Sequence, residues 1–291
     1  LKDSLWLEKV FLKHDAFDYI FHFAAESHVD NSITGPSIFV ESNVLGTQNL
    51  LECYRKINNG HGRFIHISTD EVYGHLGWND PSFTEETPIS PRSPYAASKA
   101  SSDLICLSYI ETYGLDISVT RCCNNYGPNQ HKEKFIPTII NSLKDDKKIP
   151  VYGDGLNIRD WLYVDDHARA LLHVALKGKI SETYNIGGHN ELQNITVVKT
   201  VCSILDELVP CKLNGIKKYE QLIVYVDDRA GHDFRYAVDT TKIESELDWT
   251  PKETFATGIR KTIQWYFDNR IWCENVQDGS YKGERLGVIK S

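Results

Sequence analysis

Methionine is absent from this chain of 291 residues, which begins with a leucine. An average content of about 2% would give roughly six methionines in a chain of this length. We therefore expect the sequence to be part of a longer protein. Its seven cysteines form no C-x-x-C pair and no metal-ligand spacing with histidine, which argues against a zinc site and fits a reducing cytoplasm.

Long hydrophobic runs and basic clusters are also missing. The longest apolar stretches, residues 18–25 and 168–176, are too short or too interrupted by polar residues to span a bilayer, and no signal peptide is recognisable. No run of lysine and arginine exceeds two residues, and the formal net charge of −8 argues against a nucleic-acid scaffold. We expect a soluble, cytoplasmic protein without a membrane or nucleic-acid partner.

A glycine-rich turn is missing as well. A G-x-x-G-x-x-G segment after a first strand would place a pyrophosphate at the amino terminus of a helix, and the sequence contains none. If the fold is a doubly wound sheet, we expect this chain to start after the first two or three strands.

What the sequence does contain is an alternation of short apolar strands with amphipathic helices. A composition of 41% hydrophobic and 25% charged residues is that of a globular protein. The alternation predicts an α/β fold, a doubly wound parallel Rossmann-type sheet with helices on both faces. Strands are expected at 18–25, 63–68, 116–121, 149–152 and 161–163, and helices at 36–57, 94–113, 135–143, 164–177, 196–208 and 255–269.

The alternation becomes less regular after residue 188, which indicates a smaller carboxy-terminal lobe. No repeat or low-complexity linker separates this lobe, so we expect the chain to cross between the two parts more than once. The Rossmann-type domain is predicted to comprise residues 1–127, 157–186 and about 225–240, and the substrate lobe residues 128–156, 187–224 and 241–291.

Thr69, Asp70 and Glu71 directly follow the apolar strand 64–67. They are therefore expected at the carboxyl end of a strand, where open α/β sheets bind their ligands. Two adjacent carboxyl groups can serve as an acid and a base if their pKa values differ. The simpler alternative is that the pair caps a helix or faces solvent.

Tyr95 and Lys99 lie one helical turn apart on the same face of the helix 94–113. An ammonium group beside a phenol lowers the phenol pKa from about 10, which makes it a usable base toward an alcohol. Hydride abstraction from a carbinol needs such a base. A Y-x-x-x-K spacing also arises by chance about once in such a chain. It is the combination with the acidic pair that predicts a catalytic site.

Six segments of the sequence have the character of family motifs. They are 22–30 (HFAAESHVD), 68–74 (STDEVYG), 93–103 (SPYAASKASSD), 124–128 (NNYGP), 159–161 (RDW) and 231–233 (GHD). Together they strongly resemble the dTDP-glucose 4,6-dehydratases of the extended short-chain dehydrogenase/reductase family. The resemblance covers nearly the whole chain, and its most specific element is the acidic pair, which related epimerases and decarboxylases usually lack.

The resemblance implies a mechanism. Tyr95, supported by Lys99, takes the C4 hydroxyl proton of a nucleotide-bound glucose while the C4 hydride passes to NAD⁺, and Thr69 hydrogen-bonds near that oxygen. Glu71 then removes the C5 proton, Asp70 protonates the departing C6 hydroxyl, and hydride returns to C6. Because adjacent carboxyls in opposite roles need different pKa values, we expect burial and the charged neighbour to keep Asp70 protonated.

The resemblance also implies the ligand contacts. It points to NAD as the cofactor, and it implies no metal. The implied cofactor contacts are Ala24, Ala25, Ser27, Asn43, Tyr95, Lys99 and Cys122. The implied substrate contacts are His28, Thr69, Asn125, Lys134, Pro150, Tyr152, Arg159, Asn194, Arg229 and His232.

Arg159 and Arg229 suit a diphosphate, because guanidinium donates in pairs to phosphate oxygens. The alternative for Arg159 is a local ion pair with Asp160. The segment 150–152 resembles the part of the family that packs on the nucleotide base. dTDP-glucose is favoured over UDP-glucose by the resemblance only, since one methyl group is worth about 1–3 kcal/mol of discrimination.

Three alternatives to a dTDP-glucose 4,6-dehydratase remain open at this point. They are a UDP-glucose 4,6-dehydratase, a nucleotide-sugar C4 epimerase or decarboxylase, and a non-catalytic nucleotide-sugar-binding protein. The acidic pair argues against the second, and retention of every catalytic residue argues against the third. The resemblance further implies a homodimer formed through the helices 36–57 and 94–113.

Overall fold

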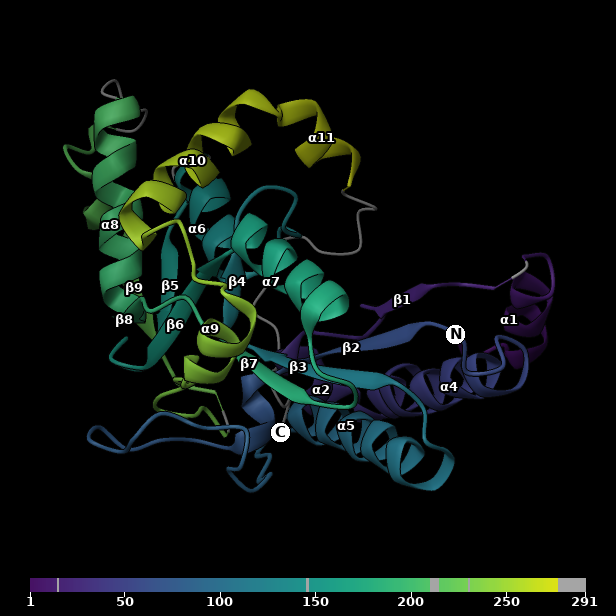
Figure 1. Cartoon of the computed structure of the whole chain (residues 1–291). Helices are drawn as coiled ribbons and strands as arrows, with labels where there is room; N and C mark the ends of the chain where they lie inside the picture. Colours follow the sequence, from purple (N-terminus) through teal and green to yellow (C-terminus); the bar gives the residue numbers. More distant parts are fainter. Residues whose placement is uncertain (15, 145–146, 210–214, 230, 277–291) are drawn as a thin grey trace.

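The computed structural model describes residues 1–14, 16–144, 147–209, 215–229 and 231–276. These residues form an α/β fold (Figure 1). The strands are β1 (Tyr19–His22), β2 (Arg63–Thr69), β3 (Ile117–Cys122), β4 (Asn124–Tyr126), β5 (Ile149–Tyr152), β6 (Ile158–Tyr163), β7 (Thr183–Ile186), β8 (Glu191–Gln193) and β9 (Ile223–Val226). The helices are α1 (Ser4–Phe11), α2 (Val29–Thr34), α3 (Pro36–Phe39), the π-helix η1 (Val40–Leu45), α4 (Gly46–Lys56), the 3-10 helix η2 (Asp70–Tyr73), α5 (Pro94–Tyr113), α6 (Phe135–Lys144), α7 (Val164–Lys177), α8 (Asn194–Leu208), the 3-10 helix η4 (Tyr219–Leu222), α9 (Thr241–Leu247), α10 (Phe255–Asp268) and α11 (Arg270–Asn275).

A four-stranded parallel sheet in the order β1-β2-β3-β7 forms one half of the structure. Its central strands are buried: in β2, Phe64 and Ile65 are fully inaccessible, and in β3 so is Ile117. Phe64 pairs with Ile117 in the register of these two strands. All six residues of β3 are buried, which is typical of parallel strands that are covered on both faces.

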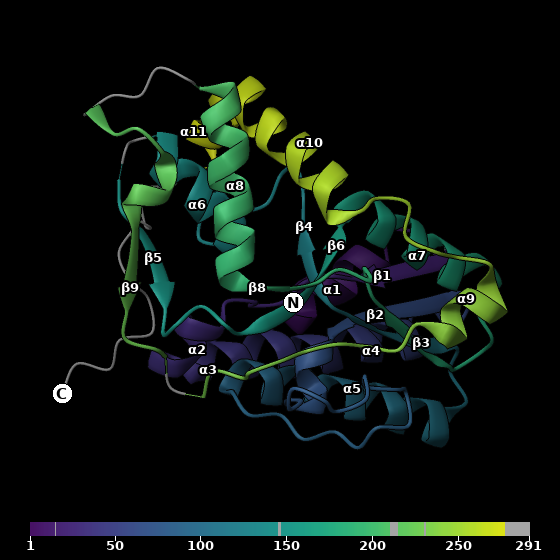
Figure 2. The same ribbon diagram turned by 90° about the vertical axis from the view of Figure 1, so that its left-hand side faces the viewer.

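Helices cover both faces of this sheet (Figure 2). On one face α4 and α5 bury a cluster that includes Leu51, Tyr54 and Cys106. On the other face α7 and α9 bury a cluster that includes Leu171 and Trp249. The α/β class and the doubly wound, parallel arrangement predicted from the sequence are therefore confirmed.

The other half is built on two smaller sheets, β4-β6-β8 and β5-β9. Helices α6, α8 and α10 pack on them around a cluster that includes Trp161, Val198 and Ile259. The chain enters this half after β3 and returns to the first half at α7 (Figure 1). The predicted division into two domains stays a prediction, and its last segment, 277–291, lies outside the described residues.

The predicted helix 36–57 is interrupted, which corrects one expectation. It begins as α3, continues as the π-helix η1 and only then becomes α4. Within η1 the Asn43 carbonyl accepts hydrogen bonds from the hydroxyls of Thr47 (2.5 Å) and Ser102 (2.7 Å). π-Helical turns occur mostly at functional sites, and this one brings the Asn43 side chain toward the loop that follows β1. The predicted strand 18–25 also stops early, at His22.

Helix α5 carries Tyr95 and has the expected ends. The Ser93 side chain accepts a hydrogen bond from the Ala96 amide (3.0 Å), and Gly114 ends the helix in the left-handed conformation with φ of 64°. Its buried face holds polar residues, among them Lys99 and Asp103. Among the helices of the described residues, neither α5 nor any other is long and apolar enough to cross a membrane.

Candidate active site

The predicted catalytic residues meet at the carboxyl end of β2. Thr69 is the last residue of the strand, and Asp70 and Glu71 open the 3-10 helix η2. The Thr69 hydroxyl accepts a hydrogen bond from the Glu71 amide and donates one to Asp70 Oδ1, each 3.3 Å long. The strand end thus places both carboxyl groups next to one hydroxyl.

Tyr95 approaches the same point from α5. Its amide donates to the Ser32 hydroxyl (3.1 Å), which ties the first turn of α5 to α2. Its phenol lies near the Thr69 hydroxyl and close enough to feel the charges of Asp70 and Glu71. The structure therefore brings together four of the five residues that the sequence predicts to be catalytic.

Asp70 and Glu71 differ in the charges around them. Burial, followed by the negative charge of Glu71, raises the pKa of Asp70 well above its ordinary 3.8. Burial also raises the pKa of Glu71, while the positive charges of Arg229 and Arg159 oppose that change. The direction for Asp70 agrees with the prediction that it is the protonated member of the pair.

The predicted effect of Lys99 on Tyr95 is wrong for this structure. The Lys99 ammonium donates to the Ile67 carbonyl at 2.8 Å, so its hydrogen bond goes to β2. Burial, followed by the charge of Glu71, raises the pKa of Tyr95 well above 10. Burial also lowers the pKa of Lys99. Desolvation outweighs the ammonium here because the phenol is enclosed among carboxyl groups.

The predicted cofactor contacts Ala24, Ala25 and Ser27 form the loop after β1. Asn43 holds the middle of this loop through both of its amide atoms: the Glu26 amide donates to Asn43 Oδ1 (2.8 Å), and Asn43 Nδ2 donates to the Glu26 carbonyl (3.0 Å). A main-chain segment fixed at the carboxyl end of a parallel strand is a surface on which open α/β sheets bind nucleotides. These residues therefore fit a nicotinamide dinucleotide.

Cys122 ends β3 beside the catalytic residues. Its thiol lies 3.5 Å from the Ser68 carbonyl and accepts from Asn125 Nδ2 at 3.3 Å. Burial raises the pKa of the thiol to about 12, which rules out a thiolate at neutral pH. Asn125, predicted to contact substrate, thus contacts the end of β3, and its buried Oδ1 has no partner among the described residues.

A large cavity of about 1070 Å³ opens beside the catalytic residues and extends into the second half of the structure. Glu71 lines it, so the catalytic pair and the cavity are continuous. Eight of the ten predicted substrate contacts line the same cavity, and Thr69 and Asn125 do not. The eight are His28, Lys134, Pro150, Tyr152, Arg159, Asn194, Arg229 and His232.

Arg159 is buried in the wall of this cavity. Its guanidinium donates to the carbonyls of Ile158 (2.7 Å) and Asp233 (2.8 Å). Its central carbon lies 4.3 Å from the centre of the Tyr236 ring, close enough for a cation–π contact. The carbonyls that accept its hydrogen bonds are neutral, so no carboxylate is hydrogen-bonded to Arg159 and its guanidinium suits an anionic ligand.

The alternative of a local ion pair between Arg159 and Asp160 does not hold among the described residues. Asp160 points to another loop, where it accepts hydrogen bonds from the amides of Gly188 (2.7 Å) and Asn190 (2.6 Å). Adjacent residues of β6 point to opposite faces of the sheet, which separates the two side chains.

Asp30 is a site residue that was not predicted individually. It is 4% exposed, and each of its carboxylate oxygens has a partner. Arg229 Nη1 donates to Oδ1 (2.9 Å), and the Tyr152 hydroxyl donates to Oδ2 (3.0 Å). Asp30 therefore fixes two predicted substrate contacts that lie far apart in the sequence. The only sequence signal was its place in the segment 22–30.

Other site residues were missed in the same way. Tyr236 lines the cavity, packs on Arg159 and donates a hydrogen bond to Asp233. Lys134 was predicted, but its contact with the Ser27 carbonyl (2.6 Å) was not. No cluster of metal-binding side chains occurs in the part of the chain that the structure describes.

Comparison with known proteins places the chain among relatives of this architecture. A family model described as GDP-mannose 4,6 dehydratase matches residues 1–262. A curated protein of Escherichia coli named dTDP-glucose 4,6-dehydratase is 55% identical over 303 residues, which cover 99% of this chain and 83% of the relative. A protein of the same name from Neisseria meningitidis serogroup B is 54% identical over 295 residues, with 99% and 83% coverage.

A solved structure agrees. The structure of DesIV from Streptomyces venezuelae, titled as a dTDP-glucose 4,6-dehydratase with NAD bound, superposes with a TM-score of 0.85 at 46% identity. The match covers 94% of this chain and 80% of that one. The chain therefore belongs to the nucleotide-sugar 4,6-dehydratase family of extended short-chain dehydrogenases/reductases, and its relatives in that family are dTDP-glucose 4,6-dehydratases.

Proposed function

We propose that this protein is an NAD-dependent dTDP-glucose 4,6-dehydratase, a hydro-lyase that forms the 4-keto-6-deoxy sugar. The observation that carries the proposal is the placement of Asp70, Glu71 and Tyr95 around the Thr69 hydroxyl, with Glu71 facing the cavity. An epimerase needs the phenol but has no use for two carboxyl groups at this position. The relatives at about half identity carry the same name.

The first step is oxidation at C4. The loop after β1 and Asn43 would hold NAD, which would supply the acceptor for the C4 hydride and the donor that returns it to C6, while Glu71 returns its proton to C5. Tyr95 takes the proton of the C4 hydroxyl as the hydride leaves C4, since the positive charge of a bound nicotinamide ring would offset the raised pKa of the phenol, and Thr69 beside it orients the same oxygen. Lys99 fixes the helix that carries Tyr95 through its bond to the Ile67 carbonyl.

The second step is elimination of water. A ketone at C4 acidifies the C5 proton, and Glu71 removes it because the charges of Arg229 and Arg159 favour its ionised form. Asp70, kept protonated by burial and by the charge of Glu71, gives its proton to the C6 hydroxyl as the C6–O bond breaks. The two neighbouring carboxyl groups thus act as base and acid in one step.

The cavity provides the binding site for the nucleotide part of the substrate. Arg159 and Arg229 face it with guanidinium groups that suit a diphosphate, and Lys134 adds a third positive charge. Pro150 and Tyr152 lie on the same wall and would pack on the base. The remaining predicted contacts, His28, Asn194 and His232, also line it. We favour dTDP over UDP because the relatives bear that name.

We further propose a homodimer formed through α3, η1 and α5. These elements pack side by side on one face of the large sheet (Figure 2). Large apolar side chains are nevertheless exposed on them, which is typical of an interface. They are Ile38 (40%), Val40 (55%), Leu45 (43%), Leu104 (56%) and Tyr113 (48%). Within the described residues, Cys53, Cys106, Cys122, Cys123 and Cys202 are buried and form no disulfide, which supports a reducing compartment such as the cytoplasm.

The test is a product assay. We expect the protein, incubated with NAD⁺ and dTDP-glucose, to form a 4-keto-6-deoxy sugar, followed by its alkali-induced absorbance, and UDP-glucose to react much more slowly. Glu71→Gln and Tyr95→Phe should each lower kcat by about 100-fold or more, since each removes a proton-transfer group. Release of a C4 epimer instead of the keto sugar would refute the proposal.

A further inference from the structure

Helix α5 carries a third residue in line with Tyr95 and Lys99. Asp103 lies four residues beyond Lys99, so the three side chains follow one face of the helix. The reaction steps above use the first two and leave Asp103 without a role. It is completely buried, and a carboxylate in that environment has to be paired and hydrogen-bonded.

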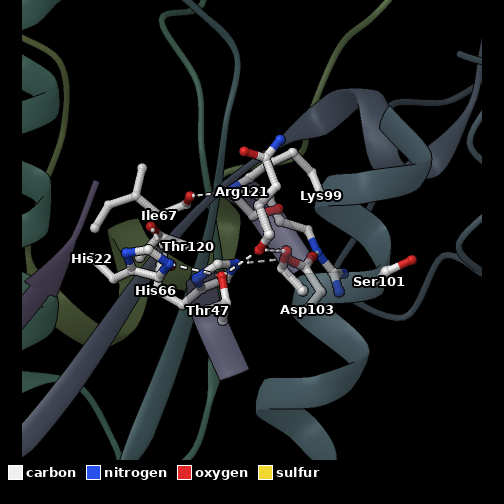
Figure 3. Close-up of polar contacts among 12 residues, drawn as sticks. His22, Thr47, His66, Ile67, Lys99, Ser101, Asp103, Thr120 and Arg121 are labelled. Atoms are coloured by element: carbon white, nitrogen blue, oxygen red, sulfur yellow. Dashed lines mark hydrogen bonds and ion pairs between the residues drawn. The ribbon is translucent and has the colours of Figure 1, made fainter. Parts of the chain in front are cut away.

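Asp103 pairs with residues of both central strands. Arg121 Nε, on β3, donates to Asp103 Oδ2 at 2.9 Å, and His66 Nε2, on β2, lies 3.2 Å from Oδ1. Figure 3 shows these side chains converging on Asp103 from the sheet. The side chains of Asp103 and Arg121 are 0% and 4% exposed, so solvent does not weaken the pair.

Arg121 also contacts Tyr73 and so links it to Asp103. Its Nη1 donates to the Tyr73 hydroxyl at 2.9 Å, and its central carbon lies 4.8 Å from the centre of the tyrosine ring. The Tyr73 hydroxyl in turn donates to Asn185 Oδ1 on β7 at 2.8 Å. On its other side the ring stacks on Phe83 with the ring centres 5.0 Å apart.

Tyr73 is the last residue of η2, the 3-10 helix that opens with Asp70 and Glu71. We propose that Tyr73, held by Arg121 and Asp103, is a positioning residue that fixes Asp70 and Glu71 for the elimination step. The proposal rests on the dehydratase function, since only that function uses both carboxyl groups. It predicts a defect in elimination and not in C4 oxidation.

The selectivity follows from how the two halves of the site are anchored. Tyr95 is held by contacts that do not involve Tyr73, namely the bond of its own amide to Ser32 and that of Lys99 to Ile67. Within the described residues, Tyr73 makes the side-chain bonds that join η2 to β3 and β7. The other contacts of η2 are the bonds of Thr69 to Asp70 and Glu71 at its start and main-chain contacts such as Ser90 to Val72 (2.9 Å).

The test is Tyr73→Phe, which keeps the ring and removes the hydroxyl. In single-turnover experiments with NAD⁺ and dTDP-glucose we expect reduced nicotinamide to form at the wild-type rate and then to decay about 10- to 100-fold more slowly, because small misplacements of a catalytic group have effects of this size. Incorporation of solvent deuterium at C5 should slow by the same factor. A substitution that only destabilised the fold would not slow the decay of reduced nicotinamide while leaving its formation at the wild-type rate.

Tyr184→Phe is the matched control. Tyr184 is also fully buried, and its hydroxyl makes two hydrogen bonds, accepting from the Lys179 amide (3.0 Å) and donating to Glu246 (3.1 Å). It lies next to Asn185 in β7, so its side chain points to the opposite face of the sheet. The control should lose comparable thermal stability and keep both phases at wild-type rates.

The outcomes separate the two proposals. If Tyr73→Phe carries out both oxidation and elimination at the wild-type rates, the positioning role is overturned. The dehydratase function would then still stand. A wild type that makes no keto sugar would overturn both. If Tyr73→Phe does not fold, Arg121→Lys gives the same measurement, since lysine keeps a charge opposite Asp103 but has only one nitrogen, where Arg121 uses Nε for Asp103 and Nη1 for Tyr73. Wild-type elimination in that variant would equally overturn the role.

Discussion

At the residue scale, two neighbouring carboxyl groups have to hold different numbers of protons, and this has a cost in stability. The pKa of Asp70 is raised well above 3.8 in the folded protein, first by burial and then by the charge of Glu71. Above pH 3.8 the unfolded chain therefore releases a proton that the folded protein retains. Ionisation favours the unfolded state, and the free energy of unfolding falls from pH 3.8 up to the folded pKa.

Asp70→Asn should remove this decrease in the free energy of unfolding with rising pH. We expect a higher Tm than wild type at neutral pH, with a difference that shrinks as the pH falls toward 3.8, where the unfolded wild-type chain also begins to be protonated. Each unit of difference in pKa corresponds to about 1.4 kcal/mol. Thermal unfolding between pH 4 and 8 measures it, with the exposed Asp268→Asn as control for a lost charge. A Tm difference independent of pH would contradict the assignment.

Which residues could be predicted depended on how far their partners lie in sequence. Thr69 and Asp70 were placed by the strand that precedes them, because a strand end is a local feature. Asp30 was missed because its partner Arg229 lies 199 residues away. The prediction that Lys99 lowers the pKa of Tyr95 was wrong for a similar reason. Helical spacing places Lys99 near the phenol, but only the folded sheet offers the Ile67 carbonyl as an alternative acceptor for its ammonium group.

At the scale of elements, η1 connects the helical layer to the loop after β1. The Asn43 side chain bonds to both main-chain groups of Glu26 and donates to the Ser98 hydroxyl at 2.8 Å. Asn43→Ala should free this loop, raising the Kd for NAD by about tenfold and lowering stability by about 1–3 kcal/mol through unsatisfied buried groups. Calorimetric titration with NAD and thermal unfolding measure the two effects.

Asn49→Ala is the control for that experiment. Asn49 lies further along in α4 and donates to the Leu1 carbonyl at 3.0 Å, away from the loop. It should leave the Kd for NAD unchanged. An equal loss of affinity in both variants would mean that the helical layer as a whole, and not the bond to Glu26, determines the conformation of the loop.

Elements with a clear apolar period were predicted well, and those formed by long-range contacts were not. The helix at 164–177 and the strand at 149–152 have the predicted bounds. The π-helical turn has no signature in apolar spacing, since it depends on hydroxyl contacts of Thr47 and Ser102. Strand β8 has three half-buried or exposed residues and forms by pairing with β6.

At the scale of the whole molecule, the sequence predicted the layers but not the way in which the cavity is assembled. Strand-helix alternation is enough to specify a parallel sheet covered on both faces. The cavity, however, is lined by residues from 27 to 274, and its walls depend on how β5, β9 and α11 pack. The resemblance identified eight of these residues as substrate contacts, which periodicity could not do.

The largest scale is that of the assembly. Leu104, on α5, is 56% exposed, and Leu172, on α7 over the other face of the sheet, is 53% exposed. Leu104→Glu should convert a dimer to a monomer, because a charge in an apolar interface stays unpaired. Leu172→Glu should not. Sedimentation velocity at micromolar protein concentration measures the oligomeric state of both variants. A wild-type protein that sediments as a monomer would refute the interface on α3, η1 and α5. A dimer that only Leu172→Glu disrupts would refute it as well.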